Sequence, residues 1–204
     1  MGRLITVVTW NIHGCIGSDR RFDMSRVAGV LQAIDADVIG LQEVGEVHGR
    51  MPLVDQARAL AELTGRHVAY GANVEAGSRR YGNAILSRFP ILAQRNYDLS
   101  VPGKEPRGCL RADLDLGEGS QLHLFNVHLG LSGSERRKQQ SLLLSADILH
   151  DAALAFPMIV LGDFNHLFPG PLKRLVRSAL QDCAVATGMA LPTFHARVPV
   201  FRLD

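Results

Sequence analysis

The stretch from Met158 to Asn165 constrains the fold of this chain most, because an unbroken apolar run stops abruptly at an acid and an amide. The run from Met158 to Leu161 lacks the alternation of a half-buried strand, so it predicts a strand buried on both faces. Asp163 and Asn165 would then lie beside Gly162 at the rim of the core, where sheet proteins hold ligands. A solvated turn is the alternative, since Asp and Asn are common turn residues.

Three further predicted strands also end in polar side chains. They lie over residues 4–11, 38–43 and 122–128, and their tips carry Asn11, Glu43, and Asn126 with His128. Each of these residues taken alone is ordinary for a strand end. Their recurrence favours a shared rim, because the tips of buried strands are few and here nearly all of them are polar.

Apolar residues at helical spacing predict helices between these strands. The predicted helices lie over residues 24–34, about 54–64, and 132 to about 155. Asp23 is expected to cap the first, Pro52 to start the second, and Ser132 with Glu135 to form a capping box before the third. Each half of the chain is therefore predicted to run strand, helix, strand with an acidic tip, an architectural pseudo-symmetry without a repeat in the residues themselves.

The middle of the chain has the pattern of short β-strands. They are predicted at residues 67–70, 83–87, 91–97, 108–116 and 121–128, separated by Gly, Pro, Asn and Ser, which favours an antiparallel meander. The polar segment 74–80 is predicted to be a mobile loop. No linker divides the 204 residues, so we expect one domain of two packed sheets with outer helices.

Composition narrows the partners and the compartment. The net charge is only +2, too small by itself to indicate a strong polyanion partner, although 19 of the 22 basic residues are Arg, which grips phosphate well. Three widely spaced cysteines predict a reduced, cytoplasmic protein. No apolar stretch approaches the length of a membrane span, so no stable membrane insertion is expected.

If the strand tips converge, the rim is lined by carboxylate, amide and imidazole groups without a thiol. This set of ligands suits a hard cation such as Mg²⁺, which keeps several waters and takes one or two protein carboxylates. A Zn²⁺ site would want more His or Cys. Arg136, Arg137 and Lys138 lie in the first turn of a predicted helix, against its dipole, where either a bound phosphate or Glu135 and solvent would compensate them.

Six short motifs, in this order along the chain, together resemble the endonuclease/exonuclease/phosphatase superfamily. The motifs are Thr9-Trp10-Asn11-Ile12, Leu41-Gln42-Glu43-Val44, Asn83-Ala84-Ile85-Leu86-Ser87, Asn126-Val127-His128-Leu129, Gly162-Asp163-Phe164-Asn165 and Arg202-Leu203-Asp204. The resemblance covers nearly the whole chain. It implies an α+β fold, a four-layer αββα sandwich of two mixed, mainly antiparallel sheets, and metal-dependent hydrolysis of a phosphate ester.

The resemblance also implies a role for each site residue. Glu43 looks like the main ligand of Mg²⁺, or of Mn²⁺, with Asn11 beside it. Asp163 would orient or deprotonate the attacking water, Asn165 would hold a phosphate oxygen, and His128 would stabilise the charge that grows on phosphorus. Further substrate contacts are expected from Arg107, Asn83, Asn126 and Arg136.

The chain departs from the family pattern at its end. The family continues to a Ser-Asp-His segment whose His is a principal catalytic group, partnered by the Asp of Arg-Leu-Asp, whereas this sequence stops at Asp204. We therefore expect a truncated form that lacks the last strand and leaves a sheet edge unpaired. A second chain that completes the site, or a copy that binds without turnover, are the alternatives.

The sequence thus predicts a metal-dependent hydrolase of a phosphodiester or phosphomonoester. The motif spellings favour the sphingomyelinase-like and phosphatase-like branch of this DNase I-like superfamily, and a DNA nuclease is the runner-up. The substrate could be a lipid head group, a small molecule or a nucleic acid. The non-enzyme alternative is a catalytically incomplete module that grips a phosphorylated partner.

Overall fold

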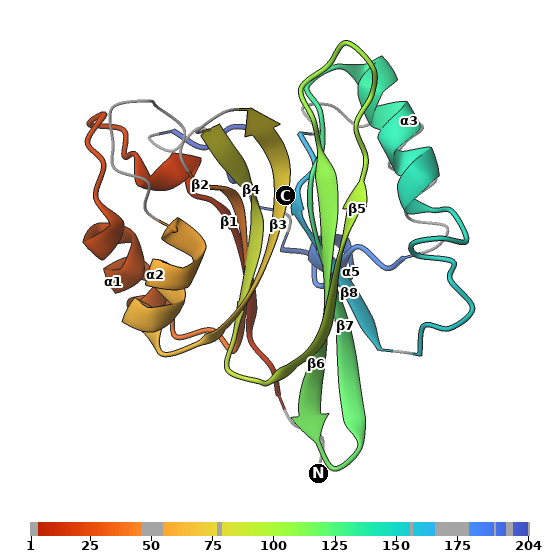
Figure 1. The fold of residues 1–204 in the computed structure, drawn as a ribbon, viewed down its shortest axis with the longest axis horizontal. Coiled ribbons are helices and arrows are strands. Elements are labelled where there is room, and N and C mark those ends of the chain that lie inside the picture. Colours follow the sequence, from red (N-terminus) through yellow and green to blue (C-terminus); the bar gives the residue numbers. More distant parts are fainter. Residues whose placement is uncertain are drawn as a thin grey trace.

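The computed structural model describes residues 4–45, 55–76, 79–155, 157–165, 180–189, 191–194 and 198–203, and it shows two facing β-sheets with helices on both outer sides (Figure 1). The strands are β1 (Val7–Asn11), β2 (Val38–Gly45), β3 (His67–Ala76), β4 (Arg79–Ser87), β5 (Ile91–Asp98), β6 (Gly108–Gly117), β7 (Ser120–His128) and β8 (Met158–Asp163). The helices are η1 (His13–Cys15), α1 (Met24–Ile34), α2 (Gln56–Thr64), α3 (Gly133–Leu143) and α5 (Cys183–Ala186). The predicted αββα sandwich is confirmed.

Each sheet has four strands, in the orders β1-β2-β4-β3 and β5-β6-β7-β8. The pairs β1–β2 and β7–β8 are parallel and the other pairs are antiparallel, so both sheets are mixed. The helices α1 and α3 lie within the two parallel connections, as the predicted strand-helix-strand halves require. Because parallel strands end at the same edge, this topology brings the four polar tips towards one rim.

Three apolar layers hold the sandwich together, because neighbouring residues of a strand point to opposite faces. In β2, Ile39 and Leu41 face outward and pack under α1 and α2 with Leu31 and Leu60. Between the sheets lie Val38, Ile85, Leu110, Leu114 and Leu124. On the far side of the second sheet, Phe125 and Val127 pack with Leu143, Ile148 and Leu149. The inner layer is apolar along most of its length and becomes polar only towards the strand tips.

The strand β8 differs from its prediction. Among the described residues it pairs only with β7, and its first three residues, Met158 to Val160, are half-buried, whereas Leu161 to Asp163 are buried. The prediction of a strand buried along its whole length was therefore wrong for its first half. The predicted end at Asp163 is confirmed.

The third predicted helix is shorter than expected. Ser132 accepts a hydrogen bond from the backbone N–H of Glu135 and caps α3, but the helix ends at Leu143 and not near Ala155. Beyond it, the Ser145 hydroxyl accepts from the N–H of Asp147, and the chain continues in turns. A serine side chain that bonds to the nearby backbone competes with the helix ladder, which the apolar spacing could not reveal.

The middle strands also correct the prediction in two respects. The segment 74–80 was predicted to be a loop, but β3 and β4 continue through it to Ala76 and from Arg79, with residues 77–78 outside the described residues. The meander is split as well, because β3 and β4 belong to the first sheet and β5 begins the second. Asp23 and Asp55 cap α1 and α2, and Pro52 lies outside the described residues. None of the described helices is both long and apolar enough to span a membrane.

Candidate active site

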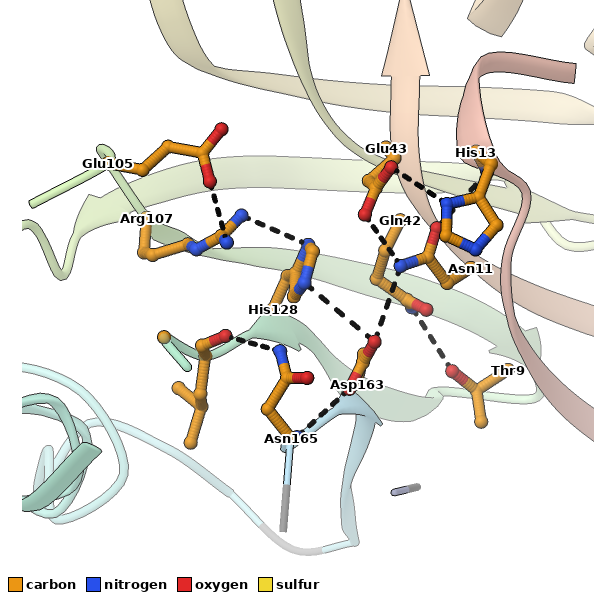
Figure 2. A network of polar contacts seen from close by, with 12 residues as sticks. Thr9, Asn11, His13, Gln42, Glu43, Glu105, Arg107, His128, Asp163 and Asn165 are labelled. Atoms are coloured by element: carbon orange, nitrogen blue, oxygen red, sulfur yellow. Dashed lines mark hydrogen bonds and ion pairs between the residues drawn. The ribbon is translucent and has the colours of Figure 1, made fainter. Parts of the chain in front are cut away.

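Side chains from the ends of β1, β2, β7 and β8 form one connected polar network at the rim between the two sheets (Figure 2). Asn11, Glu43, His128 and Asp163 all belong to it, as the recurrence of polar strand ends predicts. These residues are brought together by the parallel pairing of β1 with β2 and of β7 with β8. The structure therefore brings together the core of the predicted site.

A β-bulge in β2 explains how Glu43 reaches this rim. The register with β4 shifts between Leu41 and Val44, so Gln42 and Glu43 together oppose Asn83, and Glu43 has a φ of 55°. A bulge of this kind re-aims a side chain that regular alternation would turn to the other face. Glu43 consequently points into the network beside Gln42 (Figure 2).

Asn11 joins the two carboxylates of the site. Its Nδ2 donates to Oε1 of Glu43 at 2.9 Å and lies 3.3 Å from Oδ2 of Asp163. Because one amide nitrogen reaches both carboxylates, the side chains of Glu43 and Asp163 lie close together at the rim. The predicted convergence of β2 and β8 at this rim is thus present in the structure.

His13 is a member of this network that the sequence analysis missed. Its Nδ1 lies 3.2 Å from Oε2 of Glu43, and its backbone N–H donates to Oδ1 of Asn11 at 3.1 Å. The hydrogen bond to Glu43 raises the pKa of His13, although burial acts in the opposite direction. The available signal was its position two residues after the strand tip at Asn11.

The two carboxylates have different electrostatic surroundings. Burial alone would raise the pKa of Glu43, but hydrogen bonds from His13 and Asn11 outweigh burial and lower it to about 2. Burial raises the pKa of Asp163 despite its hydrogen bonds from the Asn165 N–H and from Asn11. The lowered pKa therefore keeps Glu43 ionised, whereas Asp163, whose pKa is raised, is the more basic carboxylate of the two.

The proton position on His128 follows from its neighbour. Nη1 of Arg107 lies 3.3 Å from Nδ1 of His128, and a guanidinium can only donate, so Nδ1 accepts. Burial, together with the charge of Arg107, lowers the pKa of His128 to about 4, which keeps the ring neutral near neutral pH. Its single proton then lies on Nε2, which is 3.7 Å from Oδ2 of Asp163.

The end of β8 is shaped by two unusual backbone positions. Gly162 has a φ of 137°, and a Cβ there would meet the carbonyl oxygen of Val127 at 1.9 Å, so only glycine fits. Asn165 has a φ of 50°; its backbone N–H donates to Oδ1 of Asp163, and its Nδ2 donates to the carbonyl of Leu129 at 2.8 Å. The bond to Leu129 holds Asn165 in place, and the bond from its N–H orients the carboxylate of Asp163.

Asn126 and Asn83 were predicted to contact the substrate, but both side chains are fully buried below the rim. Asn126 donates to the carbonyls of Leu41 and Ala84 at 2.8 Å while accepting from Nε2 of Gln42. Asn83 donates to two further carbonyls, those of Gly108 and Asn126. Their geometry is that of a buried polar floor beneath the site, which ties the two sheets together.

Arg136 is not in the network. Its guanidinium donates to the carbonyls of Gly130 and Leu131, in the loop before α3. Asp204 lies outside the described residues. Two residues that the sequence analysis did not select, Glu105 and Tyr81, contact Arg107 and extend the network beyond His128. No motif marked them, because they come from the segment before Arg107 and from the interior of β4.

The donor set fits a hard metal ion better than a soft one. Within the described part of the chain, no group of three or more His, Cys, Asp or Glu residues is arranged to hold a metal ion. Mg²⁺ does not require such a group, because it takes one or two carboxylates and keeps its waters. Glu43, an anion with a 22% exposed side chain, and the nearby Asp163 meet that requirement.

Comparison with known proteins places the chain in a family. The profile of the Endonuclease/Exonuclease/phosphatase family matches residues 8–204. The protein YbhP of Escherichia coli (strain K12) is 34% identical over an alignment of 211 residues, which covers 97% of this chain and 82% of YbhP. The chain belongs to the endonuclease/exonuclease/phosphatase family, which confirms the membership that the six motifs predict.

Solved structures show the same fold at lower identity. A conserved protein of Enterococcus faecalis V583 matches with a TM-score of 0.68 and 20% identity, over 85% of this chain and 71% of that one. The mannosyl-6-phosphatase of Bacteroides thetaiotaomicron VPI-5482 matches with a TM-score of 0.67 and 21% identity, over 86% and 70%. The family is one of nucleases and phosphatases, which supports a hydrolase of phosphate esters.

Proposed function

We propose that this protein is a metal-dependent phosphoric ester hydrolase in which an activated water attacks phosphorus in line with the leaving group. The observation that carries the proposal is the Asn11 amide, which holds Glu43 and Asp163 together beside His128. In-line displacement at phosphorus needs a positioned water and neutralisation of the developing negative charge. The network contains a group for each task.

The metal would be held by Glu43, with Asn11 beside it. Mg²⁺, or Mn²⁺ in its place, would polarise a phosphoryl oxygen and neutralise negative charge when bound there. Glu43 suits this role because its lowered pKa keeps it ionised. One or two carboxylates are enough for Mg²⁺, since water molecules supply most of its other ligands.

Asp163 would orient the attacking water and accept its proton. Its raised pKa makes it a stronger base than an exposed aspartate, and the hydrogen bonds from Asn11 and the Asn165 N–H fix its direction. Neutral His128 would donate its Nε2–H to a phosphoryl oxygen. Arg107 would bind a second phosphoryl oxygen, and Asn165 would hold a further phosphate oxygen.

We propose a small-molecule phosphate or a lipid head group as the substrate class, with DNA as the alternative. The net charge of +2 and the aromatic content of 6% give little support to a nucleic-acid surface. The solved mannosyl-6-phosphatase, at 21% identity, supports testing sugar phosphates first. A cytoplasmic location agrees with three free cysteines.

The test is hydrolysis of p-nitrophenyl phosphate and bis(p-nitrophenyl) phosphate with Mg²⁺, with Mn²⁺ and with EDTA. We expect Glu43→Gln and Asp163→Asn each to lower kcat/KM by about 100-fold or more, as loss of a general base or metal ligand does. Glu62→Gln and Asp147→Asn, at exposed positions, are the matched controls. Failure to hydrolyse either ester with either metal, or full activity of both site variants, would contradict the proposal.

A substrate panel then separates the branches. Mannose 6-phosphate and related sugar phosphates, vesicles containing phosphoinositide or sphingomyelin, and abasic duplex DNA would be compared by kcat/KM. Preference for DNA by about tenfold or more, a difference of 1.4 kcal/mol in transition-state binding, would replace our substrate class with the nuclease alternative.

A further inference from the structure

Arg107 is a buried cation that contacts three other groups of the rim. Its side chain is 6% exposed; Nη2 lies 2.8 Å from Oε2 of Glu105, and Nη1 lies 3.4 Å from the Tyr81 hydroxyl and 3.3 Å from Nδ1 of His128. A buried guanidinium is costly without an anion. In the described part of the chain, Glu105 supplies that anion (Figure 2).

Glu105 and Arg107 are held very differently. The backbone N–H of Arg107 donates to Oγ of Ser100, and its carbonyl accepts from the N–H of Leu99 at 2.9 Å, so Arg107 is anchored at the base of its loop. Glu105 lies in the exposed run of residues 102–106, and its side chain is 51% exposed. Because its side chain is half exposed, Glu105 can turn away into water, whereas the buried Arg107 is held in place.

The carboxylate of Glu105 uses both of its oxygens at this place. Oε2 pairs with Arg107, and Oε1 accepts a hydrogen bond from the Tyr81 hydroxyl. A phosphate group with two free oxygens offers the same pair of acceptors with more negative charge, one for the guanidinium of Arg107 and one for the hydroxyl of Tyr81. Nε of Arg107 is a further buried donor without a partner among the described residues.

We infer that Arg107 and Tyr81 form a phosphate subsite which the carboxylate of Glu105 fills in the free protein, and that the phosphate of an incoming ligand displaces Glu105. The inference rests on the proposed function, because it assigns a place to the substrate's phosphate. The ring of His128 lies between this subsite and the carboxylate of Asp163, since His128 contacts Arg107 on one side and faces Asp163 on the other. Glu105 thus acts as an internal competitor that sets the affinity for phosphate.

The test measures phosphate binding without catalysis. Inorganic phosphate is titrated into the protein in EDTA and followed by phosphorus NMR line broadening, with Glu105→Gln, Arg107→Met and Tyr81→Phe compared with wild type. We expect Glu105→Gln to tighten Kd by about three- to tenfold, because one half-exposed charge pair no longer competes. Arg107→Met should abolish binding, and Tyr81→Phe should weaken it.

Glu118→Gln is the matched control, since Glu118 is an exposed carboxylate in the turn between β6 and β7. A second readout is thermal stability: phosphate should raise Tm more in Glu105→Gln, where Arg107 has lost its carboxylate, than in wild type. If Glu105 merely orients Arg107, Glu105→Gln would weaken phosphate binding. Weaker or unchanged binding in that variant overturns the inference.

The two proposals can fail separately. Tighter phosphate binding in Glu105→Gln without hydrolysis of any ester would support the subsite and contradict the proposal that the protein is a hydrolase. If the protein does hydrolyse p-nitrophenyl phosphate, Glu105→Gln should lower KM by the same three- to tenfold factor, about 0.7–1.4 kcal/mol. Hydrolysis with an unchanged KM and Kd in this variant would support the proposed hydrolase activity and contradict the proposed subsite.

Discussion

The Asn11 amide is the residue-scale feature on which the candidate site depends most. Its single nitrogen bridges Glu43 and Asp163, and its oxygen accepts from the backbone of His13. Two partly buried carboxylates repel each other, so a donor between them lowers the free energy of the folded protein. Asparagine serves this purpose because it carries a donor and an acceptor but no charge.

Replacing Asn11 by aspartate removes the donor and adds a third carboxylate. We expect Asn11→Asp to lower the free energy of unfolding by about 1–3 kcal/mol in EDTA. Tm should fall by about 2–4 °C for each kcal/mol in a chain of this size. Calorimetry in EDTA and in Mg²⁺ measures both effects, and the metal should restore more stability to Asn11→Asp than to wild type. Gln94→Glu, on the exposed part of β5, is the charge-matched control.

Substitution by alanine is expected to change the free energy of unfolding in opposite directions at Gly162 and at Gly29. Gly162→Ala places a Cβ against the carbonyl of Val127, so we expect a loss of about 3 kcal/mol or more in the free energy of unfolding. Gly29 lies in α1, and no atom lies within 4 Å of the position that a Cβ would occupy there. Gly29→Ala should therefore stabilise the protein by about 0.5–1 kcal/mol. Urea titration checks both, and equal effects would refute the close approach of β7 and β8.

At the scale of elements, β7 is the strand that ties the two sheets together. Its inward-facing Asn126 donates to a carbonyl of β2 and to a carbonyl of β4, and accepts from Gln42. One side chain of the second sheet therefore satisfies buried groups on two strands of the first. These bonds hold the network together, although Oε1 of Gln42 and Oδ1 of Asn83 have no partner in the described part of the chain.

We expect Asn126→Leu to destabilise the protein by about 2–4 kcal/mol, although leucine has nearly the same size. The substitution leaves the carbonyls of Leu41 and Ala84 and the amide of Gln42 without their partner in a dry layer. Gln121→Leu, at an exposed position of the same strand, should cost less than about 0.5 kcal/mol. Denaturant unfolding of the two variants makes the comparison.

The same strand shows what the sequence could and could not predict. The end of β7 and its polar residues follow from composition and periodicity. The depth of Asn126 depends on which face of β7 meets the first sheet, and that is a long-range pairing which local patterns do not contain. The bulge at Glu43 is another such case, because a two-for-one register appears only when β4 lies beside β2. Glu105 and Tyr81 were missed for this reason too.

At the scale of the whole molecule, two separate apolar layers cover the outer faces of the sheets. Cys15 is buried in the layer with α1 and α2, and Cys109 is buried in the layer with α3, whereas Cys183 is exposed. Burial raises the pKa of Cys15 to about 12 and also raises the pKa of Cys109. Each buried thiol therefore reports on the opening of one layer.

We expect a thiol reagent at pH 8 to modify one cysteine of the native protein, Cys183, and all three after denaturation. In urea below the unfolding midpoint, Cys15 and Cys109 should react at the same slow rate if the two layers open together. Mass spectrometry of the labelled peptides measures each site. Faster labelling of one buried cysteine would show that its layer opens independently.

The arrangement of the sheets has a consequence for how the site comes into being. Each sheet is built from one contiguous half of the chain, β1 to β4 and then β5 to β8, so most strand pairing is short-range within a half. The rim takes Asn11 and Glu43 from the first half and His128 and Asp163 from the second, and the bond from Asn11 to Asp163 spans 152 residues. Contacts between residues so far apart in the sequence form late in folding, because the entropy cost of closing the loop is met before the contact adds any stability. If both sheets form before they dock, the rim is still divided between the two halves, and the bond from Asn11 to Asp163 reports that docking has taken place.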